Sequence, residues 1–98
     1  MQRGAWIFSL KKGKEQTYRD EHSRVWPELI EAARAAGLKN HSVFVLGSTV
    51  FGYGEAEDLS ATMKQLDSLD VTRRWNDAMA KLMENVEGVE LDEVFHFD

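Results

Sequence analysis

HSVFVLGSTVFGYGE, residues 41–55, contains two neighbouring strand patterns from which the rest of the fold can be worked out. Two runs rich in β-branched and aromatic residues, 41–46 and 50–55, stand on either side of the turn-forming residues 47–49. Glycine and serine between two such runs favour a tight turn. The stretch therefore predicts an antiparallel β-hairpin.

Two glycines interrupt the second run of this hairpin. Gly52 and Gly54 offer no side chain for packing, so they weaken the strand that contains them. They mark either a bulge or a place where a ligand or another backbone comes close.

A strand and a broken helix are expected before the hairpin. Residues 3–10, RGAWIFSL, form a short run with β-formers on both faces, which is typical of a strand. Apolar and aromatic residues then recur at helical spacing, with His22 filling one gap: Tyr18, Val25, Leu29, Ala33 and Ala36. Pro27 lacks an amide donor, so we expect a break around residues 23–26, with Pro27 near the first turn of a second segment. Gly37 is expected to end that helix.

Two helices and a last strand are expected after the hairpin. Asp58 or Ser60 can cap a short helix, and Asp70 can cap a longer one that Gly88 ends. The apolar residues that set the helical spacing are Leu59, Met63 and Leu66 in the first helix and Val71, Trp75, Ala78, Leu82 and Val86 in the second. Residues 91–98, LDEVFHFD, alternate in the manner of a strand.

This order, β-α-β-β-α-β, predicts an α+β domain of the ferredoxin-like class that spans residues 1–98. Both helical stretches are expected on one side of an antiparallel sheet. The strands carry more large apolar residues than one face can hold: Trp6, Phe8, Phe44, Phe51, Tyr53 and Phe95. A second copy packed face to face is the simplest cover for the other face, so we expect a homodimer with a barrel-like core, a dimeric α+β barrel.

Composition excludes several classes of protein. The net charge is -5 and no basic stripe is interleaved with aromatics, which makes nucleic acid an unlikely partner. The chain has no cysteine, so disulfides, thiolate metal sites and a cysteine nucleophile are excluded. No apolar run reaches the length of a signal-peptide core or a membrane span, so no membrane partner is expected and the cytoplasm is the simplest location.

The helical stripe around His22 could be either core or a site. Tyr18, His22 and Trp26 stand at steps of four, and aromatics at that spacing are most often core. An imidazole with a pKa near neutrality, placed beside a phenol, can also move protons, and buried polar groups need partners that a ligand can supply. His41 and His96 lack the spacing of metal ligands, and no phosphate loop or nucleophile elbow is present, so no metal and no nucleotide cofactor is expected. The sequence offers acid–base chemistry or no chemistry.

Four motifs, in this order and at this spacing, resemble the L-rhamnose mutarotase family: YRDEHSRVWPEL, GLKNHSVF, DVTRRWNDAM and ELDEVFHF. The resemblance runs from about Arg3 to Phe97, and the first motif is its most specific part. It implies a cofactor-free isomerase of the aldose 1-epimerase type that interconverts the α and β anomers of a pyranose, either L-rhamnose or a related 6-deoxyhexose. The fold that it implies, a ferredoxin-like unit that dimerises through its sheet, agrees with the fold expected from the pattern.

The resemblance also implies roles for particular residues. His22 is the proton donor to the ring oxygen, Tyr18 binds the sugar and can help to move the second proton, and Trp75 lines the sugar site. The chain departs from the family pattern at two sugar-contact positions. Asn76 stands where members of the family carry a second tryptophan, and His41 stands where they tend to carry tyrosine. These two changes are expected to alter sugar preference more than the acid–base step.

Two hypotheses from other classes stay open at this level. The first is a non-catalytic dimeric α+β barrel that binds a small metabolite or a protein, which the changes at His41 and Asn76 favour. The second is cofactor-free oxidation or haem degradation, which other dimeric α+β barrels carry out. The second hypothesis depends on fold analogy alone.

Overall fold

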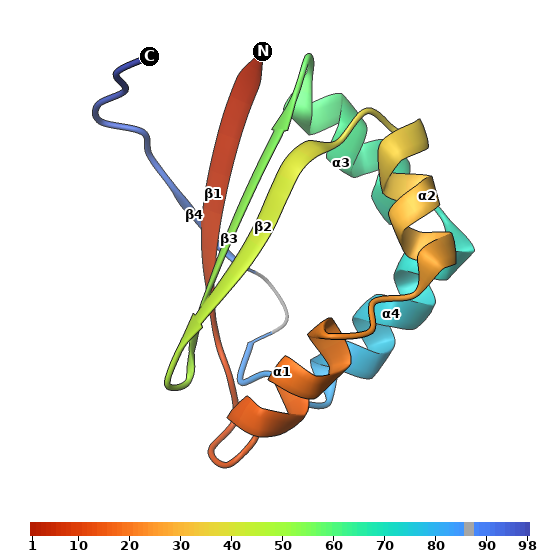
Figure 1. Ribbon diagram of the computed structural model, residues 1–98, viewed down its shortest axis with the longest axis vertical. Coiled ribbons are helices and arrows are strands. Elements are labelled where there is room, and N and C mark those ends of the chain that lie inside the picture. The colour runs from red at the N-terminus through yellow and green to blue at the C-terminus, as the bar shows by residue number, and fades with distance from the viewer. Residues whose placement is uncertain (86–87) are drawn as a thin grey trace.

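A four-stranded antiparallel sheet carries four helices on one of its sides in the computed structural model, which describes residues 1–85 and 88–98 (Figure 1). The elements follow the order expected from the sequence, with each helical stretch in two pieces. They are β1 (Gln2–Ser9), α1 (Glu15–His22), α2 (Pro27–Ala35), β2 (Lys39–Leu46), β3 (Thr49–Ala56), α3 (Leu59–Asp67), α4 (Asp70–Ala80) and β4 (Val89–Leu91). The predicted α+β, ferredoxin-like class is confirmed.

The strand order is β2-β3-β1-β4, and every neighbouring pair is antiparallel. The predicted hairpin is β2 and β3, in which Leu46 pairs with Thr49 across the turn. Gly47 adopts a positive φ of 59° in that turn, a conformation that glycine reaches without a steric penalty. The pairing of β2 with β3 shifts register between Lys39 and Ser42, so a bulge lies in β2 rather than in the glycine-containing strand.

The helices begin and end largely where the sequence predicts. Pro27 is the first residue of α2, and the break between α1 and α2 covers residues 23–26. Gly37, with φ 97°, follows the end of α2, as expected of a glycine after the last helical turn. The Asp58 side chain accepts a hydrogen bond from the backbone N–H of Ala61 and so caps α3.

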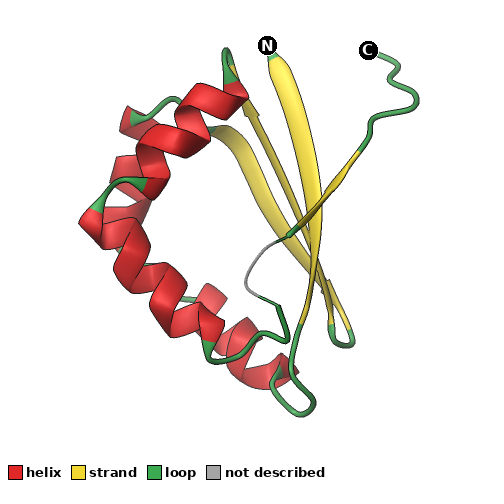
Figure 2. Cartoon of the chain, turned by 180° about the vertical axis from the view of Figure 1, so that it is seen from behind, coloured by secondary structure: helices red, strands yellow, loops and turns green. Residues whose placement is uncertain are grey.

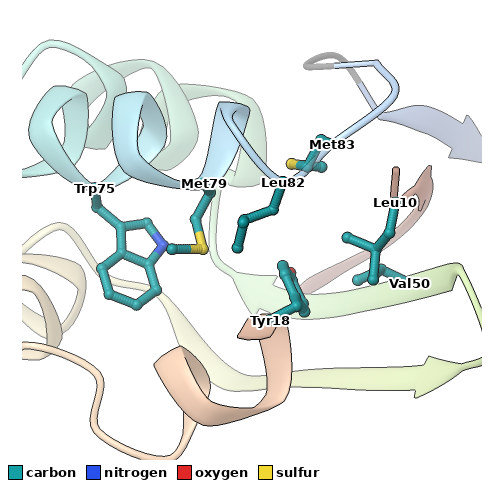
Figure 3. Packing of buried hydrophobic residues seen from close by; sticks show 7 residues of the cluster. All are labelled: Leu10, Tyr18, Val50, Trp75, Met79, Leu82 and Met83. Carbon is teal, nitrogen blue, oxygen red and sulfur yellow. The ribbon is translucent and has the colours of Figure 1, made fainter. Parts of the chain in front are cut away.

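The main core lies between the sheet and α4, at the end of the molecule where α1 begins. Tyr18 from α1 is packed with side chains from β3 and α4 and from the segments that follow β1 and α4 (Figure 3). The buried members of this cluster are Leu10, Tyr18, Val50, Trp75, Met79, Leu82 and Met83. A smaller cluster, formed by Ala36, Leu38 and Leu66, joins α2 to α3 at the other end.

Two expectations about the C-terminal part of the chain are wrong. Asp70 is the first residue of α4 and makes no cap, because its carboxylate binds the guanidinium groups of Arg73 and Arg74. The helix ends at Ala80 and not at Gly88, and Leu82 is buried in the turn that follows. Val86, expected on the same helix, lies outside the described residues.

The last strand is also shorter than expected, because β4 ends at Leu91. Residues 92–98 extend away from the helices, and their apolar side chains are exposed, with Phe95 78% and Phe97 85% accessible (Figures 1 and 2). A strand needs a neighbour for its backbone groups, and this segment has no paired strand among the described residues. None of the described helices is long and apolar enough to cross a membrane.

Candidate active site

An open cleft of about 1760 Å³ lies between the sheet and the helices, and we call it the helix-side cleft. Side chains alternate along a strand, so one face of the sheet supplies its floor, including Trp6, Phe8 and Val43. The helices α1 and α4 supply part of the opposite wall. The cleft brings together five residues singled out in the sequence: Tyr18, His22, His41, Trp75 and Asn76.

His22 is the last residue of α1, and residues 23–26 separate it from α2, which begins at Pro27. Its Nδ1 lies 3.0 Å from the carbonyl oxygen of Tyr18, one turn earlier. A carbonyl oxygen can only accept, so Nδ1 carries the hydrogen and the neutral ring presents Nε2 as its acceptor. The ring lies 4.1 Å from the ring of Tyr18 and 5.3 Å from that of Trp75, between centroids.

The surroundings of His22 favour its neutral form. Burial lowers the pKa of His22, and the positive charge of His41 lowers it further. The hydrogen bond to the Tyr18 carbonyl and the negative charge of Glu21 act in the opposite direction, and the net effect is a pKa below the usual value of 6.5. His22 is therefore a half-buried base that can accept and return a proton near neutral pH.

Tyr18 belongs to the core and to the cleft at once. Its side chain is 5% exposed and packs in the main core, yet it also lines the helix-side cleft (Figure 3). Burial raises the pKa of Tyr18 to about 12, so the phenol keeps its proton at neutral pH. It can donate a hydrogen bond to a ligand, but it is a poor base.

His41 lies on the sheet side of the cleft, and the indole of Trp6 holds it there. The two rings are stacked, with centroids 6.2 Å apart and planes 21° apart. Its Nδ1 lies 2.9 Å from the carbonyl oxygen of Tyr53 on β3, so this ring too carries its hydrogen on Nδ1 and leaves Nε2 as acceptor. The bulge in β2 lies at this point, and the imidazole supplies a hydrogen bond where the ladder is interrupted.

Gly52 and Gly54 make room for this pair of rings. A Cβ atom at Gly52 would overlap the Trp6 indole, approaching its Cε2 to 2.8 Å, and one at Gly54 would lie 3.6 Å from Nδ1 of His41. The close approach expected at these glycines is thus made by side chains of the protein itself. Trp6 was expected to be an ordinary strand residue, and only the register of β1 against β3, Trp6 opposite Gly52, shows that it forms the floor of the site.

Trp75 and Asn76 come to the cleft from α4. Trp75 is buried and meets the rings of His22 and Trp26 edge to face, the latter at 5.2 Å. Asn76 is exposed at the cleft, so its amide is open to a ligand. Trp26 packs behind Trp75 and under the guanidinium of Arg74, which lies 5.7 Å from the centre of its ring.

The arrangement can bind a small polar molecule with flat apolar surfaces and can move protons. Indole rings suit the C–H faces of a sugar ring, and the imidazole, phenol and amide groups suit its hydroxyls. Among residues 1–85 and 88–98, no three side chains of His, Asp or Glu come together as a metal site. His96, the third histidine, lies in the exposed C-terminal segment, 3.9 Å from Glu93.

A family model described as L-rhamnose mutarotase matches residues 3–97. The chain is 34% identical to the L-rhamnose mutarotase of Bacillus subtilis (strain 168), with all of both chains covered. It is 33% identical to that of Listeria monocytogenes serovar 1/2a, with 98% of each chain covered. The chain belongs to the L-rhamnose mutarotase family.

Solved structures agree with this family. The crystal structure of the L-rhamnose mutarotase from Formosa agariphila superimposes with a TM-score of 0.81 at 26% identity over all of both chains. A dimeric ferredoxin-like protein from an uncultured marine organism superimposes with a TM-score of 0.67 at 15% identity, over 98% of this chain and 96% of that one, which shows the fold alone.

Membership of the family makes this chain a sugar mutarotase, an enzyme of the isomerase type. The resemblance read from the four motifs is confirmed. The roles of individual residues in the cleft stay predictions, and the geometry above is what bears on them.

Proposed function

We propose that this chain interconverts the α and β anomers of L-rhamnose or a related 6-deoxyhexose, with His22 as acid–base residue and Tyr18, His41, Trp75 and Asn76 as sugar contacts. The observation that carries this proposal is the position of His22. Its Nδ1 is bound to a backbone carbonyl, and its ring lies beside those of Tyr18 and Trp75 in the helix-side cleft. The imidazole is therefore oriented, half-buried and adjacent to surfaces that suit a sugar.

The reaction needs two proton movements and no cofactor. Opening a pyranose requires a proton delivered to the ring oxygen and another removed from the anomeric hydroxyl. The open-chain aldehyde then rotates about the bond to its carbonyl carbon and closes again on the other face. His22, whose pKa burial lowers, can exchange a proton with the ring oxygen in both directions.

The related sugars are proposed because two cleft positions are unusually polar for this family. Asn76 replaces a flat apolar surface by an amide, and His41 replaces a phenol by an imidazole. A buried or half-buried hydrogen-bonding group discriminates strongly against sugars that cannot pair with it. The names of the relatives support L-rhamnose, and these two side chains support testing L-fucose and other 6-deoxyhexoses beside it.

We also propose that the working form is a homodimer joined through the side of the sheet that faces away from the helices. We call this side the outer face. Val89, Ile7, Phe51 and Phe44 form one row across its four strands, and Phe44 is 59% and Val89 58% exposed. Large exposed apolar surfaces of this kind are usually interfaces, and a solved structure of similar fold is described as dimeric. The cytoplasmic location expected from the sequence stays a prediction.

The first experiment is to dissolve crystalline α-L-rhamnose, and separately α-L-fucose, and to follow optical rotation with and without the protein. Faster approach to the same final rotation supports the proposal and ranks the two sugars. If L-rhamnose, L-fucose and a wider panel of aldoses all equilibrate at the uncatalysed rate, the proposal is wrong. Saturable binding without turnover would then favour the non-catalytic binding module.

A further inference from the structure

We infer that His41 is a second catalytic acid–base group, which exchanges a proton with the anomeric oxygen while His22 exchanges one with the ring oxygen. This inference rests on the proposed mutarotase site. It gives His41 a chemical role beyond the sugar contact proposed above, and it assigns the second proton carrier that the reaction needs.

His22 and His41 line the cleft from different sides, and in each ring Nδ1 is bound and Nε2 is left free to accept a proton. His22 lies at the end of α1, and His41 lies on β2, in the sheet. Each Nδ1 is bound to a backbone carbonyl, that of Tyr18 at 3.0 Å and that of Tyr53 at 2.9 Å. Since a carbonyl only accepts, both neutral rings carry their hydrogen on Nδ1 and offer Nε2 as the base. A fixed tautomer is what a proton-transferring histidine requires.

His41 is exposed, yet neighbouring side chains hold its ring in one place. Its ring stacks on Trp6, and Trp6 can lie flat on the sheet only because Gly52 has no Cβ. The stacked Trp6 and the bulge in β2 hold the imidazole at the cleft, and Trp6 is a positioning residue for it.

Tyr18 is the other side chain beside His22 that could carry the second proton. Burial raises the pKa of its phenol to about 12, so the phenol stays protonated at neutral pH. Tyr18 can donate a hydrogen bond to a sugar oxygen, but it cannot take the anomeric proton efficiently.

The proton balance of a two-histidine reaction closes without solvent. Burial favours neutral His22, so the reaction starts from the less populated state of the pair, in which His22 holds the proton. In that state His22 gives its Nε2 proton to the ring oxygen as the bond from that oxygen to the anomeric carbon breaks, and neutral His41 takes the proton of the anomeric hydroxyl. The aldehyde is released with His22 neutral and His41 protonated. Ring closure on the other face returns the proton from His41 to the aldehyde oxygen, while His22 removes the proton of the attacking hydroxyl. The pair ends as it began, holding one proton.

A pair that must hold one proton gives a characteristic pH dependence. A reaction that needs one group as acid and another as base gives a bell-shaped dependence of rate on pH. Burial lowers the pKa of His22, and the charge of His41 lowers it further. Glu21, on the same helix as His22, and the phenol of Tyr18 are the other titratable groups close to that ring. The N-terminal residue Met1 and further charged residues also line the cleft, namely Arg3, Lys64, Asp67, Asp77, Glu90 and Glu93. The limbs of the profile are therefore assigned by the variants below and not by their position on the pH scale.

The test compares His41→Asn with the wild type and with a control variant, His96→Asn. Asparagine places its amide nitrogen near the position of Nδ1, so it can still donate to the Tyr53 carbonyl, but it has no titrating Nε2. Anomer exchange is measured by saturation-transfer NMR on the sugar that the wild type accelerates most, from pH 5 to 8. We expect His41→Asn to lower kcat by about 10²–10⁴-fold with little change in KM, and to replace the bell by a single titration step or a flat profile. His96→Asn is expected to match the wild type in rate and in profile.

Two results separate this inference from the proposed function. If His41→Asn raises KM while kcat and both limbs of the bell persist, His41 only contacts the sugar, and the inference is wrong while the mutarotase site stands. If the wild type accelerates no sugar, the proposed function is wrong and the inference is wrong with it.

A second measurement covers the case in which His41→Asn does not fold. Long-range ¹H–¹⁵N correlation spectra of the wild type, without sugar, report the tautomer of each histidine. We expect the Nδ1–H form for both His22 and His41 above pH 7. An Nε2–H tautomer at His41 would contradict the inference, because Nε2 could not then accept the anomeric proton.

Discussion

The two faces of the sheet differ in kind. The face toward the helices carries indole and imidazole rings, and there Nδ1 of His41 donates to the Tyr53 carbonyl. The outer face carries the row Val89, Ile7, Phe51 and Phe44, in which exposed apolar side chains meet one another, as Phe44 and Phe51 do at 6.1 Å between ring centroids. All the helices lie on one side of the sheet (Figure 2). That side carries groups that can bind a ligand and move protons, and the other side carries exposed apolar side chains.

Apolar residues indicate a site where they lie beside groups that can titrate, and an interface where they lie beside one another. On the helix side, aromatic rings surround groups that can titrate. The absence of a Cβ at Gly52 lets the Trp6 indole lie close to the sheet. On the outer face, polar groups pair with one another, as the hydroxyl of Tyr53 donates to Glu55 at 2.6 Å. The predictions below change one face and measure whether the other responds.

The largest effect is expected from a charge on the outer face. In Phe44→Glu, the carboxylate would have to lose its water at the centre of the proposed interface, which we expect to weaken dimerisation by about 2–4 kcal/mol, as for a central interface residue. Sedimentation equilibrium at micromolar concentration measures this. Ala35→Glu, on exposed helix α2, serves as the matched control and is expected to stay dimeric. A wild type that is itself a monomer at these concentrations would contradict the dimer.

The next effect concerns the floor of the cleft. Gly52→Ala places a Cβ against the Trp6 indole, which cannot rotate away without leaving the sheet, and we expect a loss of about 1–3 kcal/mol in the free energy of unfolding together with a slower reaction. Urea unfolding and the mutarotation rate measure the two losses. Gly4→Ala is the control, because its Cβ would crowd only the methyl end of Leu59, which can turn aside, and would lie at an ordinary contact distance of 3.6 Å from Cζ3 of Trp6. Equal losses in both variants would show that Trp6 is not held as described.

A smaller effect is expected from Tyr18→Phe, which removes a hydroxyl and keeps the packing of the ring. If Tyr18 only donates one hydrogen bond to the sugar, kcat/KM should fall by about 0.5–1.5 kcal/mol in transition-state free energy, or roughly 2–13-fold. The pH profile should keep its shape. A fall as large as that expected for a catalytic base, with loss of one limb of the profile, would assign the second proton to Tyr18 instead.

The smallest effect is on stability as pH changes. The pKa of His22 is lowered by folding, so the unfolded chain binds more protons than the folded chain between the folded value and about 6.5. The free energy of unfolding should therefore fall as pH is lowered through that range, and this contribution should be fully present above it. Urea midpoints from pH 5 to 8 measure the slope, which should be shallower in His22→Asn than in His96→Asn. Equal slopes would contradict the burial of His22.

Much of the fold could be predicted from local signals. The hairpin, the break before Pro27 and the end of α2 at Gly37 each depend on the backbone chemistry of one or two residues, and the structure confirms all three. The end of α4 and the length of β4 could not be predicted, because they depend on tertiary contacts. Apolar spacing continues to Leu82 although the helix stops at Ala80, and Leu82 and Met83 reach the core from the turn instead.

Only the part of the site that depends on local spacing could be predicted from the sequence. His22 and Tyr18 share a helix, so their spacing alone places them together, and the structure shows their rings 4.1 Å apart. His41 and Trp6 meet only through the register of three strands and a bulge, which no local pattern encodes. Two glycines facing a tryptophan across a strand pair were the available signal, and they could be interpreted only after the pairing was known.

The anomer exchange rate of His22→Asn shows whether His22 moves protons in the helix-side cleft. The variant is compared with the wild type and with His96→Asn on the same sugar, after circular dichroism and sedimentation have shown that all three share one fold and one oligomeric state. If His22 is the acid–base residue, kcat should fall by about 10²–10⁴-fold in His22→Asn and stay unchanged in His96→Asn. A folded His22→Asn protein that exchanges anomers at the wild-type rate would contradict it and return His22 to a structural role.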